Sequence, residues 1–216
     1  EVNPSNILSF SAVAYFFASE IYAKYKVPIG LINSALGGSP AESWLSADAV
    51  KQFPEYDTEY QKFKDGTLGA QIEANDKKVS TDWYSEVNRQ DEGLKKHWSK
   101  ADLDDVDWPE MNIPGYWGDY ALEKTNGAVW FRKEVDLPNL KATSAKLILG
   151  RIVDADSVYV NGNFVGTTSY LYPPRKYAFD PKFLKEGKNE IAIRVINSSG
   201  KGGFVEDKPY QLILDK

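Results

Sequence analysis

The sequence is poor in the residues that carry redox and metal chemistry: it contains no cysteine, one histidine and one methionine among 216 residues. The lack of cysteine excludes disulfides and thiolate metal sites, and it fits any redox compartment. No apolar run approaches the roughly 20 residues of a membrane-spanning helix. Acidic residues outnumber basic ones, 31 against 26, and the net charge is −5. We therefore expect neither a nucleic acid nor a membrane as a partner.

Aromatic residues, in contrast, are plentiful. They make up 13% of the chain, with 13 tyrosines and six tryptophans, and hydrophobic residues make up 42%. This is ample for a packed core in one large or two small domains. Many tyrosines and tryptophans are typical of sugar-handling proteins and equally of β-sandwich cores.

The residues at 29–44 predict a short buried strand over 29–32, a turn at Gly37-Gly38 and a helix begun by Ser39-Pro40. Serine is a good N-cap, and proline is tolerated at the first helical position. Such a turn leaves backbone N–H groups without partners, and an oxyanion hole is one use of them. An ordinary strand-to-helix turn of an α/β domain fits the same residues.

A helix is expected immediately before this stretch, over residues 9–26, with Ser9 as its cap and Val27-Pro28 ending it. Helix, short loop and buried strand resemble half of a doubly wound α/β unit. Because a parallel strand needs neighbours, the sheet partners of a strand at 28–33 must lie outside this chain or be missing. The expected apolar face of the helix consists of Phe10, Val13, Ala14, Phe17, Ile21 and Tyr25.

Three consecutive blocks, at 10–18, 27–34 and 37–44, resemble the sialate O-acetylesterase family of SGNH-type carbohydrate esterases. The resemblance implies that Gly37 or Gly38 contributes to an oxyanion hole and that Glu42 contacts substrate. The family's Gly-Gln-Ser-Asn-Met and Asp-x-x-His blocks do not occur here. The resemblance therefore implies an internal piece of a longer bacterial enzyme, periplasmic or secreted, that is inactive alone. Its partners would be the rest of the esterase domain and an acetylated glycan, such as acetylated sialic acid.

The charged middle of the chain predicts helices and no chemistry. A long helix is expected from about Leu68 to Trp98, with a break near 91–93. His97, the sole histidine, would have to serve any complete Ser-His-Asp triad, but no serine nucleophile motif accompanies it. We interpret His97 as a surface residue near a helix C-terminus.

From residue 107 onward the pattern is β. Asn161-Gly162 between two short apolar runs predicts a two-residue hairpin turn, because both residues tolerate positive φ. Alternation over 190–196 predicts one buried face made of Ile191, Ile193 and Val195. Several strands at this spacing predict a β-sandwich. The expected strands cover 128–135, 145–149, 157–160, 164–165, 177–180, 190–196 and 210–214.

The runs at 129–133, 158–166 and 184–195 resemble the galactose-binding-like jelly roll. That domain occurs at the N-terminus of many β-galactosidases and glucuronidases, and it is also inserted into bacterial sialate O-acetylesterases. The resemblance covers residues 107–214 and implies a fold more than a function, because this domain often only packs against a catalytic domain.

Two aromatic stretches are candidate sugar contacts. One is Tyr116-Trp117, with Trp130 and Arg132 near it in the pattern. The other is the proline-stiffened loop 170–175, where Tyr170 and Tyr172 offer stacking faces and Arg175 offers a partner for a sugar carboxylate. Ordinary packing is the alternative for each, and it is the favoured one for Trp130.

Asp154 and Asp156 would be the ligands of a structural calcium, although two carboxylates in one turn are a weak signal. We therefore predict no cofactor and no metal.

Together these patterns predict an α+β chain. A helical lobe with a partial SGNH α/β element would occupy residues 1–106, and a galactose-binding-like β-sandwich would occupy 107–216. The favoured function is part of an enzyme that hydrolyses acetyl esters on sugars. The alternatives are a non-catalytic carbohydrate-binding module and a structural spacer.

Overall fold

The computed structural model describes residues 2–7, 10–120, 122 and 125–215. The chain divides into two compact units, Glu1–Glu73 and Ala74–Lys216. The division falls within helix α4 (Thr67–Gln90), whereas the sequence pattern placed the domain boundary at 106 and 107. Among the described residues, no helix combines the length and apolar character needed to cross a membrane.

Unit 1 begins with the predicted helix, α1 (Ala12–Tyr25). Its cap is Ser11, whose side chain accepts a hydrogen bond from the backbone N–H of Ala14 at 3.3 Å; Ser9 lies outside the described residues. Lys26 adopts a left-handed conformation and ends the helix. No described residue of α1 is buried, and Val13, Phe17 and Tyr25 of the predicted apolar face are exposed.

The predicted strand at 28–33 is wrong: no strand is present there in the described structure. A buried parallel strand needs hydrogen-bonding neighbours, and the elements of unit 1 are helices and turns. Gly37 and Gly38 form a tight turn closed by the Ser39 N–H on the Leu36 carbonyl at 3.3 Å. The SGNH element is therefore not formed.

The expected helix at Ser39-Pro40 is only the short 3₁₀ turn η2 (Ala41–Trp44), for which Pro40 is the cap residue. Two short helices follow, α2 (Ala47–Val50) and α3 (Pro54–Phe63). The predicted long helix is confirmed as α4, and it ends where the sequence indicated a break. Asp91 then caps α5 (Glu92–Lys95) by accepting the Leu94 N–H at 3.1 Å.

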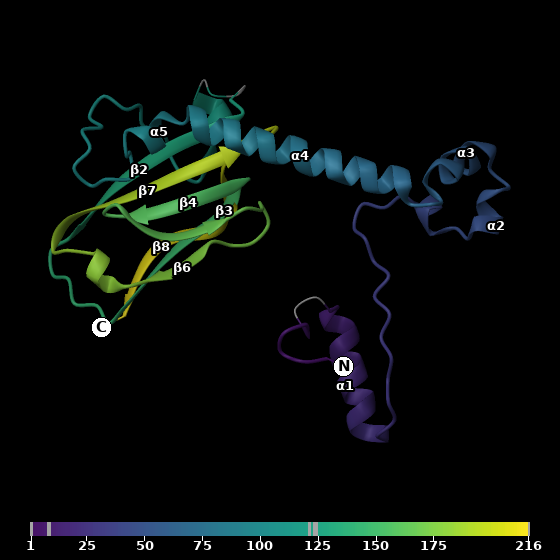
Figure 1. Ribbon diagram of the computed structural model, residues 1–216. Coiled ribbons are helices and arrows are strands. Elements are labelled where there is room, and N and C mark those ends of the chain that lie inside the picture. The colour runs from purple at the N-terminus through teal and green to yellow at the C-terminus, as the bar shows by residue number, and fades with distance from the viewer. Residues whose placement is uncertain (1, 8–9, 121, 123–124, 216) are drawn as a thin grey trace. The chain divides into compact units, whose positions relative to one another are not determined.

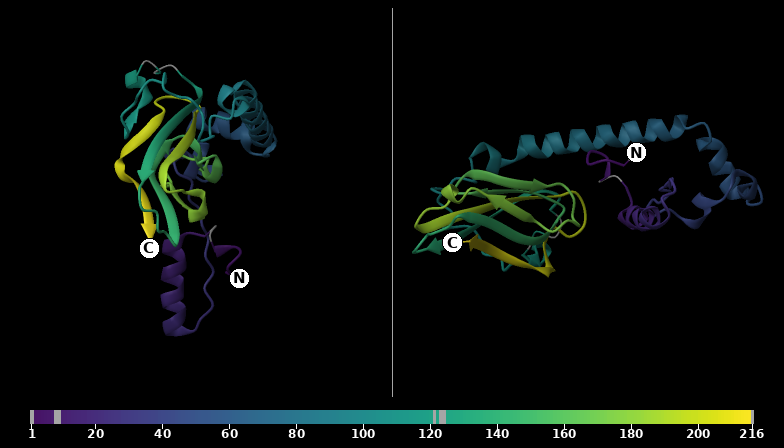
Figure 2. Two further views of the ribbon diagram at one scale, coloured as in Figure 1. Left: turned by 90° about the vertical axis from the view of Figure 1, so that its left-hand side faces the viewer. Right: turned by 90° about the horizontal axis from the view of Figure 1, so that it is seen from below.

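Unit 2 contains two antiparallel sheets packed face to face (Figures 1 and 2). One has the strand order β1-β8-β3-β6 and the other β2-β7-β4-β5. The predicted sandwich and its predicted strands are confirmed. The strands are β1 (Gly115–Tyr116), β2 (Gly127–Leu137), β3 (Ser144–Val153), β4 (Ala155–Val160), β5 (Asn163–Thr168), β6 (Lys176–Phe179), β7 (Gly187–Asn197) and β8 (Gly203–Asp215), with 3₁₀ turns η3 (Trp117–Tyr120) and η4 (Pro181–Phe183).

The core lies between the sheets, where apolar side chains from both inner faces meet. Trp117 is fully buried there, stacked on Phe131 with ring centroids 6.2 Å apart. Asn161 and Gly162 have φ values of 47° and 80°, and Val160 pairs with Asn163 across them. This confirms the predicted hairpin turn. The other fully buried core residues include Leu147, Ile152, Val158, Val160, Val195 and Phe204.

Residues 88–108, here called the clasp, cover the outer face of the β2-β7-β4-β5 sheet. Asp91 accepts hydrogen bonds from Arg194 Nε at 2.6 Å and from the Trp130 indole at 2.9 Å. Arg132 donates to the Asp105 carboxylate at 2.5 Å and to the Trp98 carbonyl at 2.6 Å. These contacts confirm the packing interpretation of Trp130 and show that Arg132 is a packing residue as well.

The clasp explains why the alternating pattern of β7 predicted only one of its two buried faces. Ile191, Ile193 and Val195 are buried in the core as expected. The opposite face is buried too, because Arg194 and its neighbours on that face lie beneath the clasp. Sequence alternation shows which residues share a face but not what covers the second face.

Candidate functional site

The loop between β5 and β6, residues 169–175, presents two exposed aromatic rings. Tyr170 and Tyr172 are each 58% exposed, and their rings meet edge to face with centroids 5.1 Å apart. This segment is called the tyrosine loop below. Exposed tyrosines that pack mainly on each other offer faces to a ligand, so the predicted aromatic pair is accessible.

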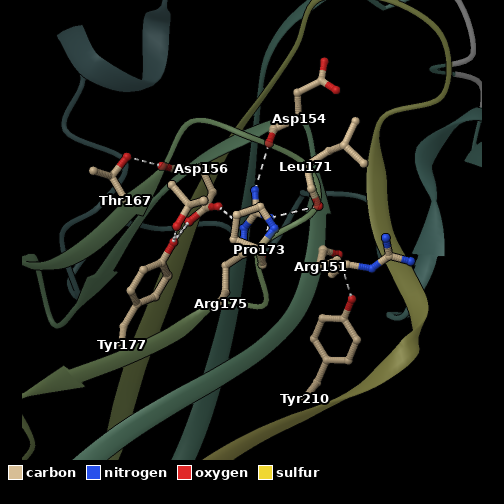
Figure 3. Close-up of polar contacts among 10 residues, drawn as sticks. Arg151, Asp154, Asp156, Thr167, Leu171, Pro173, Arg175, Tyr177 and Tyr210 are labelled. Atoms are coloured by element: carbon tan, nitrogen blue, oxygen red, sulfur yellow. Dashed lines mark hydrogen bonds and ion pairs between the residues drawn. The ribbon is translucent and has the colours of Figure 1, made fainter. Parts of the chain in front are cut away.

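Arg175 holds this loop from beneath (Figure 3). Its side chain is fully buried, and Nε donates to Asp156 Oδ1 at 2.6 Å. Nη1 donates to the carbonyls of Pro173 at 2.8 Å and Leu171 at 3.2 Å, and Nη2 donates to the Asp154 carbonyl at 2.8 Å. The predicted contact between Arg175 and a sugar carboxylate is therefore corrected: its guanidinium is occupied in fixing the loop.

Asp156 completes the buried network. Its second carboxylate oxygen accepts the Tyr177 hydroxyl at 2.6 Å, and that hydroxyl also lies 2.8 Å from Thr168 Oγ1. Burial raises the pKa of Asp156, opposed by its hydrogen bonds from Tyr177 and Arg175. Burial and then the nearby Asp156 charge raise the pKa of Tyr177, so its hydroxyl stays a donor at neutral pH.

Because of this network, few carboxylate oxygens of Asp154 and Asp156 are available to bind the calcium ion considered there. The Asp156 carboxylate is used by Arg175 and Tyr177, and one Asp154 oxygen accepts from Asn197 at 3.2 Å and from the Ser198 N–H at 3.0 Å. Among the residues that the structure describes, no three His, Cys, Asp or Glu side chains are grouped to hold a metal ion.

A polar surface lies beside the tyrosine loop. Arg151 on β3 forms a two-point ion pair with Asp207 on β8, at 2.7 Å and 3.2 Å. This contact is the main cause of the raised pKa of Arg151, and the nearby Tyr116 and Tyr172 contribute to it. Lys201 lies over the Tyr116 ring at 6.0 Å. Side chains from β1, β3, β8 and two loops thus meet at one end of the sandwich.

Sequence reasoning found only the aromatic part of this surface. Arg151, Lys201 and Asp207 are separated along the chain and belong to no motif, so only strand pairing could reveal them. Of the other predicted pair, Tyr116 borders the surface, whereas Trp117 is a core residue. The structure gives Trp117 no part in the surface.

The remaining predicted site residues belong to unit 1. Gly37 and Gly38 are exposed, and a Cβ atom on either would meet no atom within 4 Å. Glu42 borders a hollow of about 360 Å³ that Tyr56 and Tyr60 of α3 also line. His97, in unit 2, is exposed and has φ of 56° directly after α5.

Comparison with known proteins shows a similarity to one domain of glycoside hydrolases. Residues 75–213 match the family described as glycosyl hydrolases family 2, sugar binding domain. Two Formosa agariphila proteins, each named "Putative beta-glucuronidase", are 30% identical over 112 and 130 residues. These alignments cover 46% and 56% of this chain but only 11% and 14% of the relatives, so the chain spans a small part of each.

The solved structures that resemble this chain include a β-glycosidase from Bacteroides vulgatus. It is 25% identical, with a TM-score of 0.45, and the match covers 57% of this chain and 18% of that one. A Bacteroides uniformis β-glucuronidase is also 25% identical, with a TM-score of 0.42 over 49% of this chain and 14% of that one.

These findings overturn the esterase prediction. The matched family and the curated relatives are glycoside hydrolases, not serine esterases, and the predicted SGNH strand is absent from the described structure. The jelly-roll resemblance was the sound one, since it included the domain found in glucuronidases. With residues 75–213 matched, the chain belongs to the glycosyl hydrolases family 2 sugar-binding domain family.

Proposed function

We propose that unit 2 is a non-catalytic glycan-binding domain of a longer glycoside hydrolase that acts on β-glucuronides. The observation that carries this proposal is the family match over residues 75–213, which coincides with the sandwich and its clasp. The β-glucuronidase names of the 30% identical relatives support the substrate class. The partner within the enzyme would be its catalytic domain.

The chemistry of the sandwich supports binding rather than hydrolysis. Glycosidases generally use two carboxyl groups on either side of the scissile bond, about 5–10 Å apart. At the surface beside the tyrosine loop, the Asp207 carboxylate is ion-paired with Arg151. Asp156 is fully buried beneath that loop. The domain would therefore hold glycan for a separate catalytic centre.

The covered and exposed surfaces of the sandwich indicate where a glycan would bind. The clasp buries Trp130 and Arg194 on the outer face of one sheet, which removes that face from contact with a glycan. The tyrosine loop is exposed and is fixed by the buried Arg175. A rigid loop loses little conformational entropy on binding, which favours it as a contact surface.

The test is binding of β-glucuronide oligosaccharides by the chain, measured by isothermal titration calorimetry. We expect binding without release of glucuronic acid, and we expect the double variant Y170A/Y172A to weaken it by about tenfold, or ~1.4 kcal/mol. The matched control is Tyr60→Ala, which removes an exposed tyrosine in unit 1 and should leave affinity unchanged. Hydrolysis by the chain, or equal binding by the double variant, would contradict the proposal.

A further inference from the structure

Several polar groups on the surface beside the tyrosine loop have no hydrogen-bond or ion-pair partner among the described residues. Asp207 occupies Nε and Nη2 of Arg151, and in the described chain Nη1 makes no hydrogen bond. The hydroxyls of Tyr116 and Tyr172 likewise have no hydrogen-bond partner among the described residues. Lys201 forms no ion pair there and contacts only the face of the Tyr116 ring. Donors are thus directed at solvent from three separate segments.

Charged groups of both signs lie at this surface. Arg151 and Asp207 neutralise each other, and their side chains are 24% and 42% exposed. Lys201 adds a positive charge without a counter-ion, and Lys208 also lies near Asp207, whose pKa is lowered mainly by Arg151. The Asp154 carboxylate at this end of the sandwich accepts hydrogen bonds from Ser198 and Asn197, whereas Lys201 has no anionic partner among the described residues. An exposed cation of this kind attracts a carboxylate locally.

Tyr116 connects the two cationic groups. Its ring lies beneath Lys201 at 6.0 Å, and strand β8 relates it to Arg151, because Tyr116 pairs with Gly203 and Arg151 pairs with Val205 on that strand. The tyrosine loop, which carries Tyr172, ends next to Arg151, because the Arg175 N–H donates to the Gly150 carbonyl at 2.8 Å. The aromatic faces and the cations therefore belong to one continuous surface, as recognition of an acidic sugar requires.

We propose that this surface binds the carboxylate of a uronic-acid residue between Lys201 Nζ and Arg151 Nη1, with the sugar ring against Tyr172. The proposal rests on the glycan-binding function proposed above and specifies its ligand. Asp207 acts as a positioning residue: by engaging two nitrogens of the fork it holds Nη1 toward the ligand.

Asp154 contacts both segments that carry this site, and Figure 3 shows its contact with Arg175. Its carbonyl accepts Nη2 of Arg175, the anchor of the tyrosine loop, at 2.8 Å. Its carboxylate accepts the Ser198 N–H at 3.0 Å, at the start of the segment that leads to Lys201. One shared residue thus holds both the tyrosine loop and the start of the segment that leads to Lys201, which reduces the backbone entropy lost on binding.

The experiment compares methyl β-glucuronide with methyl β-glucoside, which differ at C6 by a carboxylate in place of a hydroxymethyl group. Binding of both is measured by NMR titration of the chain at low and high salt. We expect tighter binding of the glucuronide, with a preference that declines as salt rises, because the charges are exposed. Lys201→Ala and Arg151→Lys should each reduce that preference by about fivefold to tenfold.

Lys176→Ala is the matched control, since it removes an exposed lysine from β6. It should retain the full preference, and near-UV circular dichroism should show native tertiary structure in all variants. If the chain binds oligosaccharides but Lys201→Ala and Arg151→Lys keep the glucuronide preference, the carboxylate site is refuted while the glycan-binding function stands. If no glycan of either kind binds, both proposals fail.

Discussion

Replacing Arg175 with methionine tests whether the tyrosine loop depends on its buried anchor. Methionine keeps much of the side-chain volume but removes the charge and every donor. Asp156, whose side chain is fully buried, would then lose its ion-pair partner, and the carbonyls of Leu171, Pro173 and Asp154 would lose their donors. Removing one partner of a buried ion pair costs about 3–5 kcal/mol. That is a large part of the ~5–15 kcal/mol that stabilises a typical domain.

The assay is urea unfolding followed by tryptophan fluorescence and by near-UV circular dichroism. Arg151→Met provides the matched control, because it makes the same chemical change at a partly exposed ion pair, and ion pairs screened by solvent contribute little to stability. Adding Asp156→Asn to Arg175→Met should recover part of the loss, because the uncompensated charge is removed. The reasoning is refuted if Arg175→Met costs no more than Arg151→Met, or if the double variant shows no coupling.

Three further predictions follow from close contacts, backbone conformation and buried hydroxyls. Gly93→Ala should lower the free energy of unfolding by about 1–3 kcal/mol, because its Cβ would lie 2.2 Å from Trp130 Nε1. The measurement is the urea midpoint, and an unchanged midpoint would mean that the clasp shifts at no cost. Gly162→Val should lower the thermal midpoint, because φ of 80° costs a β-branched residue about 1–2 kcal/mol, and an equal midpoint would contradict that turn. The pKa values of Tyr177 and Tyr210 are raised mainly by burial, so the unfolded state ionises first as pH rises above the ordinary tyrosine value of about 10. Stability should therefore be complete below that pH and fall above it by at most ~1.4 kcal/mol per pH unit for each tyrosine, less with solvent screening. Urea titrations from pH 9 to 11 should show a shallower fall in Tyr177→Phe and in Tyr210→Phe, and parallel slopes would exclude this linkage.

The sandwich could be predicted because its signals are local. Alternation over 190–196 and the Asn161-Gly162 turn depend on backbone preferences and on residues next to each other in the chain, and both are confirmed. The break near residue 91 could be predicted too, since an aspartate followed two residues later by a glycine favours a new cap over a continued helix.

The strand at 28–33 shows where local patterns fail. An apolar run followed by glycines fits a buried strand, but a strand exists only if other strands supply its hydrogen bonds. The described part of unit 1 supplies none. The esterase prediction depended on that segment, and it failed when residues 75–213 matched a glycosidase domain.

The sequence by itself determined the β-sandwich, its main hairpin and the aromatic loop at 170–175, because periodicity and turn chemistry are written in neighbouring residues. Only the tertiary structure decided the role of Arg175. The sequence predicted that its guanidinium binds a ligand, whereas in the folded chain it donates to the buried Asp156. It also decided that Arg151, Lys201 and Asp207 meet beside the tyrosines, since antiparallel pairing of β3 with β8 brings Arg151 opposite Val205 across more than fifty intervening residues. Contacts between residues so distant in the chain depend on which strands pair, and local sequence patterns do not specify that pairing.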